Sequence, residues 1–231
     1  MSHLFRSILD VLSPRACAIC GCRLAVSEDE ICGVCNWHLP RTGFARDAYD
    51  NELARIFWGR FPIEKAHAFI FFQPHNDPSP LIYDLKYHGS SNIGLWLGHT
   101  LAVEARDEHF FDGIDILVPV PITWRRRMNR GYNQSDCICA GIRQVTGLPV
   151  ATKALKRIRF VQSQTGLKHS ERSENVEKAF RLERPDDIAG KHVLLVDDII
   201  TTGATINACA QELLKAPGVT VSVLSVGYTK G

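Results

Sequence analysis

The sequence predicts an α/β protein in which a doubly wound parallel sheet follows a small N-terminal metal-binding unit. Short apolar runs recur from about residue 60 onward, and segments with helical periodicity separate them. This alternation is typical of a parallel sheet covered by helices. Four cysteines arranged as two pairs precede this region. We therefore expect an N-terminal helix and zinc ribbon over residues 1–45 and the α/β domain over residues 60–231.

The elements of the α/β domain follow from their periodicity and from the residues that bound them. Strands are expected at 66–72 (AHAFIFF), 114–120 (IDILVPV), 148–152 (LPVAT), 193–197 (VLLVD) and 219–226 (VTVSVLSV). Helices are expected at 80–89, 92–106, 133–147 and 206–215, where apolar residues recur at helical spacing and glycines mark two of the ends. Residues 41–61 are expected to form a polar linker.

The chain shows no segment that predicts a membrane span. Residues 4–12 have apolar side chains at helical spacing, but Arg6 and Asp10 interrupt them, so the segment suits a short amphipathic helix and not a signal peptide or a spanning helix. We expect a cytoplasmic protein, in which cysteines stay reduced or bind metal.

The N-terminal cysteines form the pairs CAIC and CGVC. Each CxxC turn can present two thiolates to one tetrahedral zinc ion, and a site with four thiolates is structural because no open position remains for a substrate. The expected ligands are Cys17, Cys20, Cys32 and Cys35. Cys22 and His38 lie close enough in sequence to replace one ligand. A redox CxxC motif or a chance pairing are the alternatives.

The segment 193–205 (VLLVDDIITTGAT) joins a buried strand to a helix through two acids and a loop of small residues. Such a loop before a helix N-terminus offers backbone N–H groups and the positive end of the helix dipole to a phosphate. Like charges repel, so Asp197 and Asp198 are expected to bind hydroxyl groups beside the phosphate. An ordinary strand-to-helix turn or a Rossmann-like nucleotide loop are the alternatives.

Positive charge is concentrated in one part of the chain. Residues 123–172 contain eleven Lys and Arg against Asp136 and Glu171, a net charge of +9, whereas the remaining residues sum to −7. The RRRMNR run at 125–130 directly follows an expected strand, so it should lie at the same carboxyl edge as the small-residue loop. We expect it to bind an anionic group there. A solvated charge run is the alternative.

Residues 193–205 resemble the 5-phosphoribosyl 1-pyrophosphate (PRPP) binding motif of the type I phosphoribosyltransferases. The resemblance implies that Asp197 and Asp198 contact the ribose 2′ and 3′ hydroxyls and that Mg²⁺ binds with PRPP. It implies that the 5′-phosphate lies in the loop formed by Thr201, Thr202, Gly203, Ala204 and Thr205. Purine-salvage relatives carry an acidic residue at the position of Thr201, whereas relatives with pyrimidine or amine acceptors lack it. The acceptor stays open.

The cysteine pairs, LKYHG (85–89), residues 118–135 and residues 163–180 also resemble the competence protein F (ComF) family in order and spacing. This resemblance implies a role in DNA uptake during natural transformation. It favours Arg126 and Arg130 for the pyrophosphate, with Asn133 and Gln134 ordering the turn. The competing hypothesis is a non-catalytic PRPP-binding adaptor for single-stranded DNA or for a DNA-translocating helicase.

Residues 156–175 are polar and basic with little periodicity. Such a segment suits a mobile lid over the diphosphate. Its candidate contacts are Gln164, Lys168 and Arg172, supported by Thr165 and Asn175. An ordinary surface loop is the alternative for each of these residues.

Overall fold

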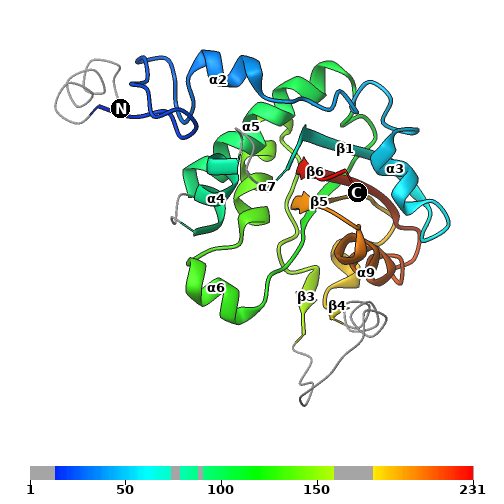
Figure 1. Ribbon diagram of the computed structural model, residues 1–231. Helices are drawn as coiled ribbons and strands as arrows, with labels where there is room; N and C mark the ends of the chain where they lie inside the picture. Colours follow the sequence, from blue (N-terminus) through cyan, green and yellow to red (C-terminus); the bar gives the residue numbers. More distant parts are fainter. Residues whose placement is uncertain (1–13, 74–78, 88–90, 159–178, 231) are drawn as a thin grey trace, which may run out of the picture.

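A parallel sheet of four strands forms the centre of the molecule (Figure 1). The computed structural model describes residues 14–73, 79–87, 91–158 and 179–230. The strands lie in the order β1-β6-β5-β2, and every neighbouring pair is parallel. Their bounds are Ile63–Phe71 for β1, Ile116–Pro119 for β2, His192–Ile200 for β5 and Thr220–Tyr228 for β6. The expected α/β class with a parallel sheet is confirmed.

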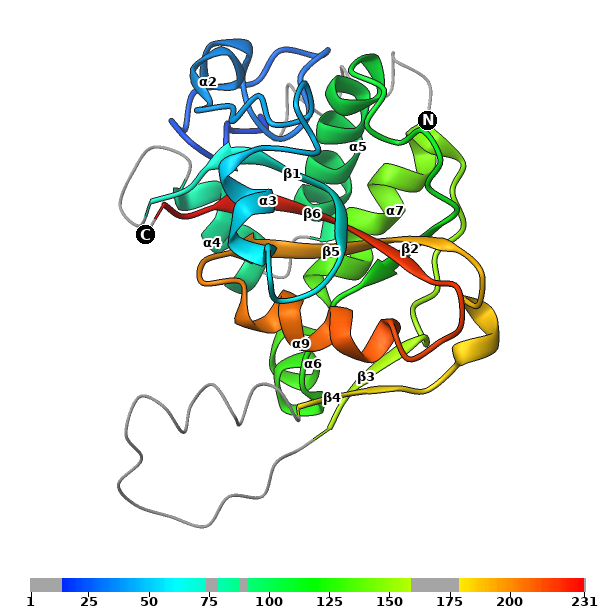
Figure 2. The same cartoon turned by 90° about the vertical axis from the view of Figure 1, so that its right-hand side faces the viewer.

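Helices cover both faces of this sheet (Figure 2). In β5, Leu194 and Val196 belong to one buried cluster, whereas Val193 and Leu195 belong to the other, because successive side chains of a strand point to opposite faces. The first cluster includes residues of α4, α5 and α7, and the second includes residues of α3 and α9. These helices span Glu52–Phe57 (α3), Ser79–Tyr87 (α4), Ser91–Asp107 (α5), Gln134–Thr146 (α7) and Ala204–Leu213 (α9).

Two glycines allow α5 and α7 to approach closely. A Cβ atom on Gly98 would lie 2.0 Å from the carbonyl oxygen of Ile138, and one on Gly141 would lie 2.1 Å from that of Leu95. No side chain fits at these distances. The pair therefore fixes α7, whose N-terminus borders the candidate site described below.

Residues 41–61 do more than link two units, so the expectation of a simple polar linker is wrong. Backbone N–H groups of Thr42 and Phe71 donate to the carbonyls of Phe69 and Pro40, respectively, at 3.1 and 2.8 Å, and this segment runs beside β1. It thereby covers part of an otherwise unpaired sheet edge. The segment also contains α3. Side chains of the segment add to these contacts, since Thr42 Oγ1 and Asn51 Nδ2 donate to backbone carbonyls of β1.

Other expected elements are partly confirmed. The strand expected at 148–152 is only an isolated bridge between Val150 and Leu117, because backbone bonds join Leu117 to just Pro149 and Ala151. The basic run at 125–130, for which no helix was expected, lies in helix α6 (Trp124–Arg130). The remaining described elements are α2 (Gly33–His38), the antiparallel pair β3 (Leu155–Arg157) and β4 (Phe180–Leu182), and a 3-10 turn (Pro185–Asp187).

No helix in the described part of the chain has both the length and the apolar character needed to cross a membrane. The N-terminal helix expected at 4–12 lies outside the described residues, as does Gly89, at which the helix expected at 80–89 was to end.

Candidate functional site

The acid pair and the small-residue loop lie at the carboxyl end of β5. The strand was expected to end at Asp197, but it continues through Asp198 to Ile200. Both acids therefore belong to the strand, and both are half-buried. The Oδ1 atom of Asp197 accepts a hydrogen bond from the backbone N–H of Asp198 at 2.8 Å. The Asp198 Oδ1 atom accepts one from the N–H of Ile199 at 2.7 Å. These bonds hold both carboxylates in place.

The loop after β5 turns into α9 at a glycine with a left-handed backbone. Gly203 is the N-cap of α9 and has φ of 76°, a conformation that favours glycine. Phe57 of α3 packs against it, since a Cβ atom on Gly203 would lie 2.7 Å from the Phe57 ring. Arg60 also supports the loop by donating to the Thr202 carbonyl at 2.9 Å. Segments far apart in sequence therefore fix the loop.

Two small cavities meet at the acid pair. One, of about 60 Å³, is lined by Asp197 and by residues 199–206, which include Thr201, Thr202, Gly203, Ala204 and Thr205. The other, of about 190 Å³, is lined by both acids and by side chains of α6, α7 and β3. Asp197, Ile199 and Thr205 line both cavities. The arrangement can hold a ligand with an anionic group at each end and hydroxyl groups between them.

Helix α6 brings two of the expected arginines to the larger cavity. Arg126 and Arg130 both line it, as residues four apart lie on one face of a helix. Thr123 caps the start of α6 by accepting from the N–H of Arg126, and Gly131 ends the helix in a left-handed conformation. The run is thus an ordered helix that presents two of its four arginines to the cavity.

The turn between α6 and α7 is ordered by Asn133. Its Nδ2 atom donates to the Val120 carbonyl at 3.1 Å and to Asp136 Oδ1 at 2.9 Å. The Gln134 amide makes no such bond, because its Nε2 atom has no hydrogen-bond partner among the described residues. Of the two residues expected to order the turn, the structure assigns that contact to Asn133.

Three residues that line the larger cavity were not predicted from the sequence to contact a ligand. Gln134, Ser135 and Arg157 all line the larger cavity, and the Ser135 hydroxyl donates to Asp197 Oδ1 at 3.5 Å. Arg157 is the last residue of β3 and lies at the start of the segment 156–175, which was expected to form a lid. The lid candidates Gln164, Lys168 and Arg172, together with Thr165 and Asn175, lie outside the described residues.

Larger cavities occur elsewhere, and in one of them the arginines are paired with glutamates. One of about 330 Å³ is lined by Arg41, Arg46, Glu104 and Glu108 among others. Arg41 pairs with Glu104 at 2.8 Å and Arg46 pairs with Glu108 at 3.1 Å. The cavities beside β5 differ because their arginines and acids surround a common space at the carboxyl edge of the sheet, where open α/β sheets bind ligands.

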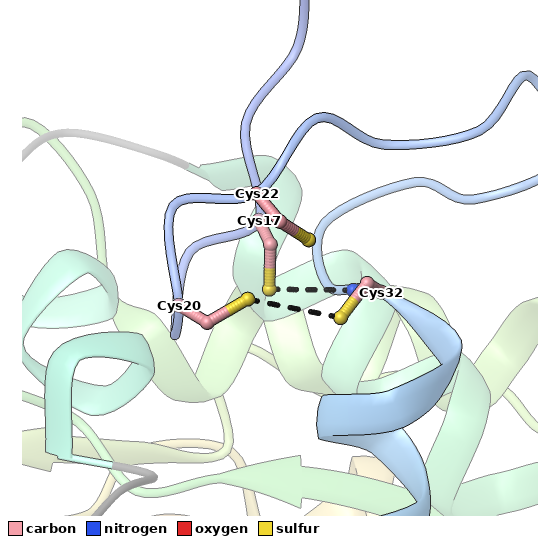
Figure 3. A group of neighbouring side chains, drawn as sticks. All are labelled: Cys17, Cys20, Cys22 and Cys32. Carbon is pink, nitrogen blue, oxygen red and sulfur yellow. Dashed lines mark hydrogen bonds between the residues drawn. The ribbon is translucent and has the colours of Figure 1, made fainter.

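The N-terminal thiols converge on one point (Figure 3). The Sγ atoms of Cys17, Cys20, Cys22 and Cys32 all lie within 4.8 Å of one another, and those of Cys20 and Cys32 are 3.8 Å apart. A tetrahedral ion with metal–sulfur bonds of about 2.3 Å requires sulfurs about 3.8 Å apart. The donor set and its spacing therefore fit a metal ion.

Backbone groups and neighbouring thiols polarise this cluster. The N–H of Cys32 donates to Cys17 Sγ at 3.3 Å, and that of Cys35 donates to Cys32 Sγ at 3.4 Å. A hydrogen bond from the Cys22 backbone, with further bonds from neighbouring thiols, lowers the pKa of Cys20 to about 6, which favours the metal-binding thiolate.

Cys22 thus enters the group where the CxxC spacing indicated Cys35. Cys35 stays close, because its thiol interacts with those of Cys17, Cys20 and Cys32. His38, the other substitute considered, bonds instead through Nδ1 to the Val34 carbonyl at 2.8 Å. The structure places five thiols near one centre.

Comparisons with known proteins agree with this fold. The family model of the phosphoribosyl transferase domain matches residues 123–227. DNA utilization protein YhgH of Shigella flexneri is 30% identical over 220 residues, which cover 91% of this chain and 95% of that protein. Competence protein F of Haemophilus influenzae is 31% identical over 141 residues, 59% of this chain and 62% of that protein.

Among solved structures, the glutamine phosphoribosylpyrophosphate (PRPP) amidotransferase from B. subtilis, complexed with ADP and GMP, superposes with a TM-score of 0.41 and 22% identity. The match covers 62% of this chain and 30% of that chain. The parallel sheet and the family match together define a protein with a phosphoribosyl transferase domain. The chain belongs to the family of the DNA utilization proteins named YhgH and of competence protein F.

Proposed function

We propose that this chain binds PRPP at the carboxyl edge of its sheet and acts as a phosphoribosyltransferase-like protein in DNA uptake. The observation that carries the proposal is the pair of adjoining cavities that share Asp197, Ile199 and Thr205. PRPP is a ribose with a phosphate at one end and a diphosphate at the other. A phosphate loop, an acid pair and an arginine-lined cavity follow one another in the same order.

Each part of the site has a separate task. The loop from Thr201 to Thr205 holds the 5′-phosphate with backbone N–H groups and the dipole of α9. Asp197 and Asp198 accept hydrogen bonds from the ribose hydroxyls, while Arg126 and Arg130 bind the diphosphate oxygens. Mg²⁺, whose preferred ligands are carboxylate, hydroxyl and phosphate oxygens, would neutralise charge on the diphosphate beside the acid pair.

Transfer of the ribosyl group would break the bond between ribose C1 and the diphosphate. The arginines of α6 would then stabilise the negative charge of the departing diphosphate. Thr201 lies in the loop where purine-salvage enzymes of the resembling class carry an acid, so this position supplies no carboxylate to a purine acceptor.

For the N-terminal cluster we propose a structural zinc ion. Thiolate ligands favour zinc among common metals, and a site closed by four cysteines supports the fold instead of catalysis. The cluster packs against the main core, since Cys17 and Cys32 belong to the same buried cluster as α5. Zinc would order the unit that precedes the segment along β1.

A non-catalytic adaptor for single-stranded DNA or for a DNA-translocating helicase is the second candidate. The exposed side chains of Trp124 and Met128 on α6 favour it, at 65% and 63% exposure. They share this basic helix with Arg125 and Arg127, and exposed aromatic and cationic side chains together can stack bases and bind phosphates. The names of the relatives motivate the connection to DNA.

One pair of double variants separates these functions. Arg126→Ala with Arg130→Ala should weaken PRPP binding strongly but leave ribose 5-phosphate binding nearly unchanged, because ribose 5-phosphate lacks the diphosphate. Arg125→Ala with Arg127→Ala is the matched control, since neither residue lines the cavity. Calorimetry measures the affinity for both ligands, and fluorescence anisotropy over a salt series measures the affinity for single-stranded DNA.

An unaltered ratio of PRPP to ribose 5-phosphate affinity in the first variant would contradict the placement of the diphosphate. If both variants instead lower DNA affinity and flatten its salt dependence by about one unit or less for each lost phosphate contact, α6 follows a nucleic-acid backbone.

A further inference from the structure

Gln134 is a buried amide at the larger cavity beside β5. It is the first residue of α7, is 1% exposed and lines the cavity. Its Nε2 atom has no hydrogen-bond partner among the described residues. A buried donor without an acceptor destabilises a folded protein. A ligand oxygen in the cavity would supply the missing acceptor.

The N-terminus of α7 borders the same cavity. Gln134 and Ser135 begin this helix of 13 residues and line the cavity. The N-cap residue, Asn133, makes no side-chain capping bond, and its Oδ1 atom, which would accept such a bond, has no hydrogen-bond partner among the described residues. The positive end of the helix dipole therefore favours an anion at this wall.

Arg157 contributes a positive charge to the cavity from β3. Its guanidinium lies 5.0 Å from the centre of the Phe180 ring, and no ion pair joins it to a carboxylate within the described ranges. Burial, followed by the nearby charge of Arg126, lowers the pKa of Arg157, although Asp197 acts in the opposite direction. An anion between Arg126 and Arg157 would relieve the repulsion between them.

We propose that Gln134 Nε2 and the Arg157 guanidinium bind the diphosphate of PRPP together with the arginines of α6. The inference rests on the proposed function and adds two contacts that lie outside α6 and outside the phosphate loop. Gln134 donates to a diphosphate oxygen beside the α7 N-terminus. Arg157, held by the Phe180 ring, donates from β3.

In the protein without ligand, the Gln134 Nε2 atom has no acceptor among the described residues. A glutamine whose amide contacts only the ligand does not stabilise the folded protein when no ligand is bound. Replacing it by an apolar residue of similar size removes an unpaired buried donor, so the free protein should be as stable as before or more stable. A glutamine with a structural role would show the opposite behaviour.

The test uses the full chain with Gln134→Met and, separately, Arg157→Met. Lys156→Met is the matched control, because Lys156 belongs to the same strand but is exposed and does not line the cavity. Calorimetry measures the affinities for PRPP with Mg²⁺, for ribose 5-phosphate and for inorganic pyrophosphate. Urea unfolding measures the stability of each protein without ligand. Both cavity variants should bind PRPP and pyrophosphate about tenfold or more weakly, since each removes a hydrogen bond to a charged group. Their ribose 5-phosphate affinity should stay within about twofold, and Gln134→Met should not lower the unfolding midpoint.

Unchanged PRPP and pyrophosphate affinities in both variants would overturn this inference, while PRPP binding by the unaltered chain would leave the proposed function standing. An equal loss of affinity for ribose 5-phosphate, or a lower unfolding midpoint for Gln134→Met, would indicate a structural role and would also overturn the inference. If the unaltered chain binds pyrophosphate but not PRPP, the proposed function fails. A loss of pyrophosphate affinity in the two cavity variants would then still support the contacts of Gln134 and Arg157 with a diphosphate. Binding of neither ligand overturns both.

Discussion

Gly203→Ala should destabilise the protein and distort the phosphate loop together. Two costs add at this position. A residue with a Cβ atom pays about 1–2 kcal/mol in the left-handed conformation, and Gly203 has φ of 76°. The new methyl group would also lie 2.7 Å from Cε1 of Phe57 and 3.1 Å from Cγ2 of Ile56. Overpacking of this kind costs about 1–3 kcal/mol.

The Phe57 ring cannot move away easily because it is fully buried. We therefore expect a total loss of about 2–5 kcal/mol in the free energy of unfolding. This loss is smaller than the stability of many domains, about 5–15 kcal/mol, so the variant should remain folded. If the loop shifts to relieve the contact, the affinity for ribose 5-phosphate should fall by about tenfold, or 1.4 kcal/mol.

Gly147→Ala is the matched control. Gly147 has φ of 73° at the end of α7, and a Cβ atom there would meet nothing within 4 Å. This variant should lose only about 1–2 kcal/mol in the free energy of unfolding, from the left-handed backbone conformation, and its ligand affinity should stay unchanged. Urea unfolding and calorimetry of both variants measure the difference. Equal losses of stability in the two variants would refute the argument that Phe57 supports the loop.

Two further outcomes follow from the N-terminal cluster and from a buried histidine. Protein prepared without chelator should contain about one zinc ion per chain by elemental analysis, and an absence of zinc would contradict the assignment. Cys32→Ser should lose the zinc ion, whereas the control Cys137→Ser should keep it. Comparing the zinc content of Cys22→Ser with that of Cys35→Ser shows which of these two thiols completes the site. Burial lowers the pKa of His67 to about 3 from its ordinary value of 6.5, so the unfolded chain binds more protons below pH 6.5, and stability should fall as the pH drops from 6.5 toward 3, by at most about 1.4 kcal/mol per unit. His67→Leu should flatten this part of the urea-unfolding pH profile, and an unchanged slope would show that His67 does not contribute to it.

The parts of the site that are contiguous in sequence were predictable. Residues 193–205 contain the strand, the acid pair and the phosphate loop in one stretch, so local periodicity and turn chemistry were enough to place them at one edge of the sheet. The cysteine pairs were equally visible. Cys22, which the sequence offered as a substitute ligand, joins the group because the chain folds back on itself between Cys17 and Cys22.

The parts that depend on tertiary contacts were not predictable in this way. Arg157 lines the cavity from β3, which pairs with β4. Gln134 stands out because it is buried, which is unusual for a polar residue type. Helix α6 lacks a buried apolar face, since Trp124 and Met128 are exposed. Its only sequence signals were Thr123 before it and Gly131 after it.

Calorimetric titration of PRPP with Mg²⁺ into the unaltered chain and into Asp197→Asn with Asp198→Asn tests the central claim most directly. Asparagine keeps the shape of aspartate but removes the two negative charges, and the loss of repulsion between neighbours should leave the fold intact, as circular dichroism and urea unfolding will show. We expect saturable binding of PRPP to the unaltered chain and no measurable binding to the double variant. The same PRPP affinity in both proteins would contradict the assignment of this acid pair to the ribose.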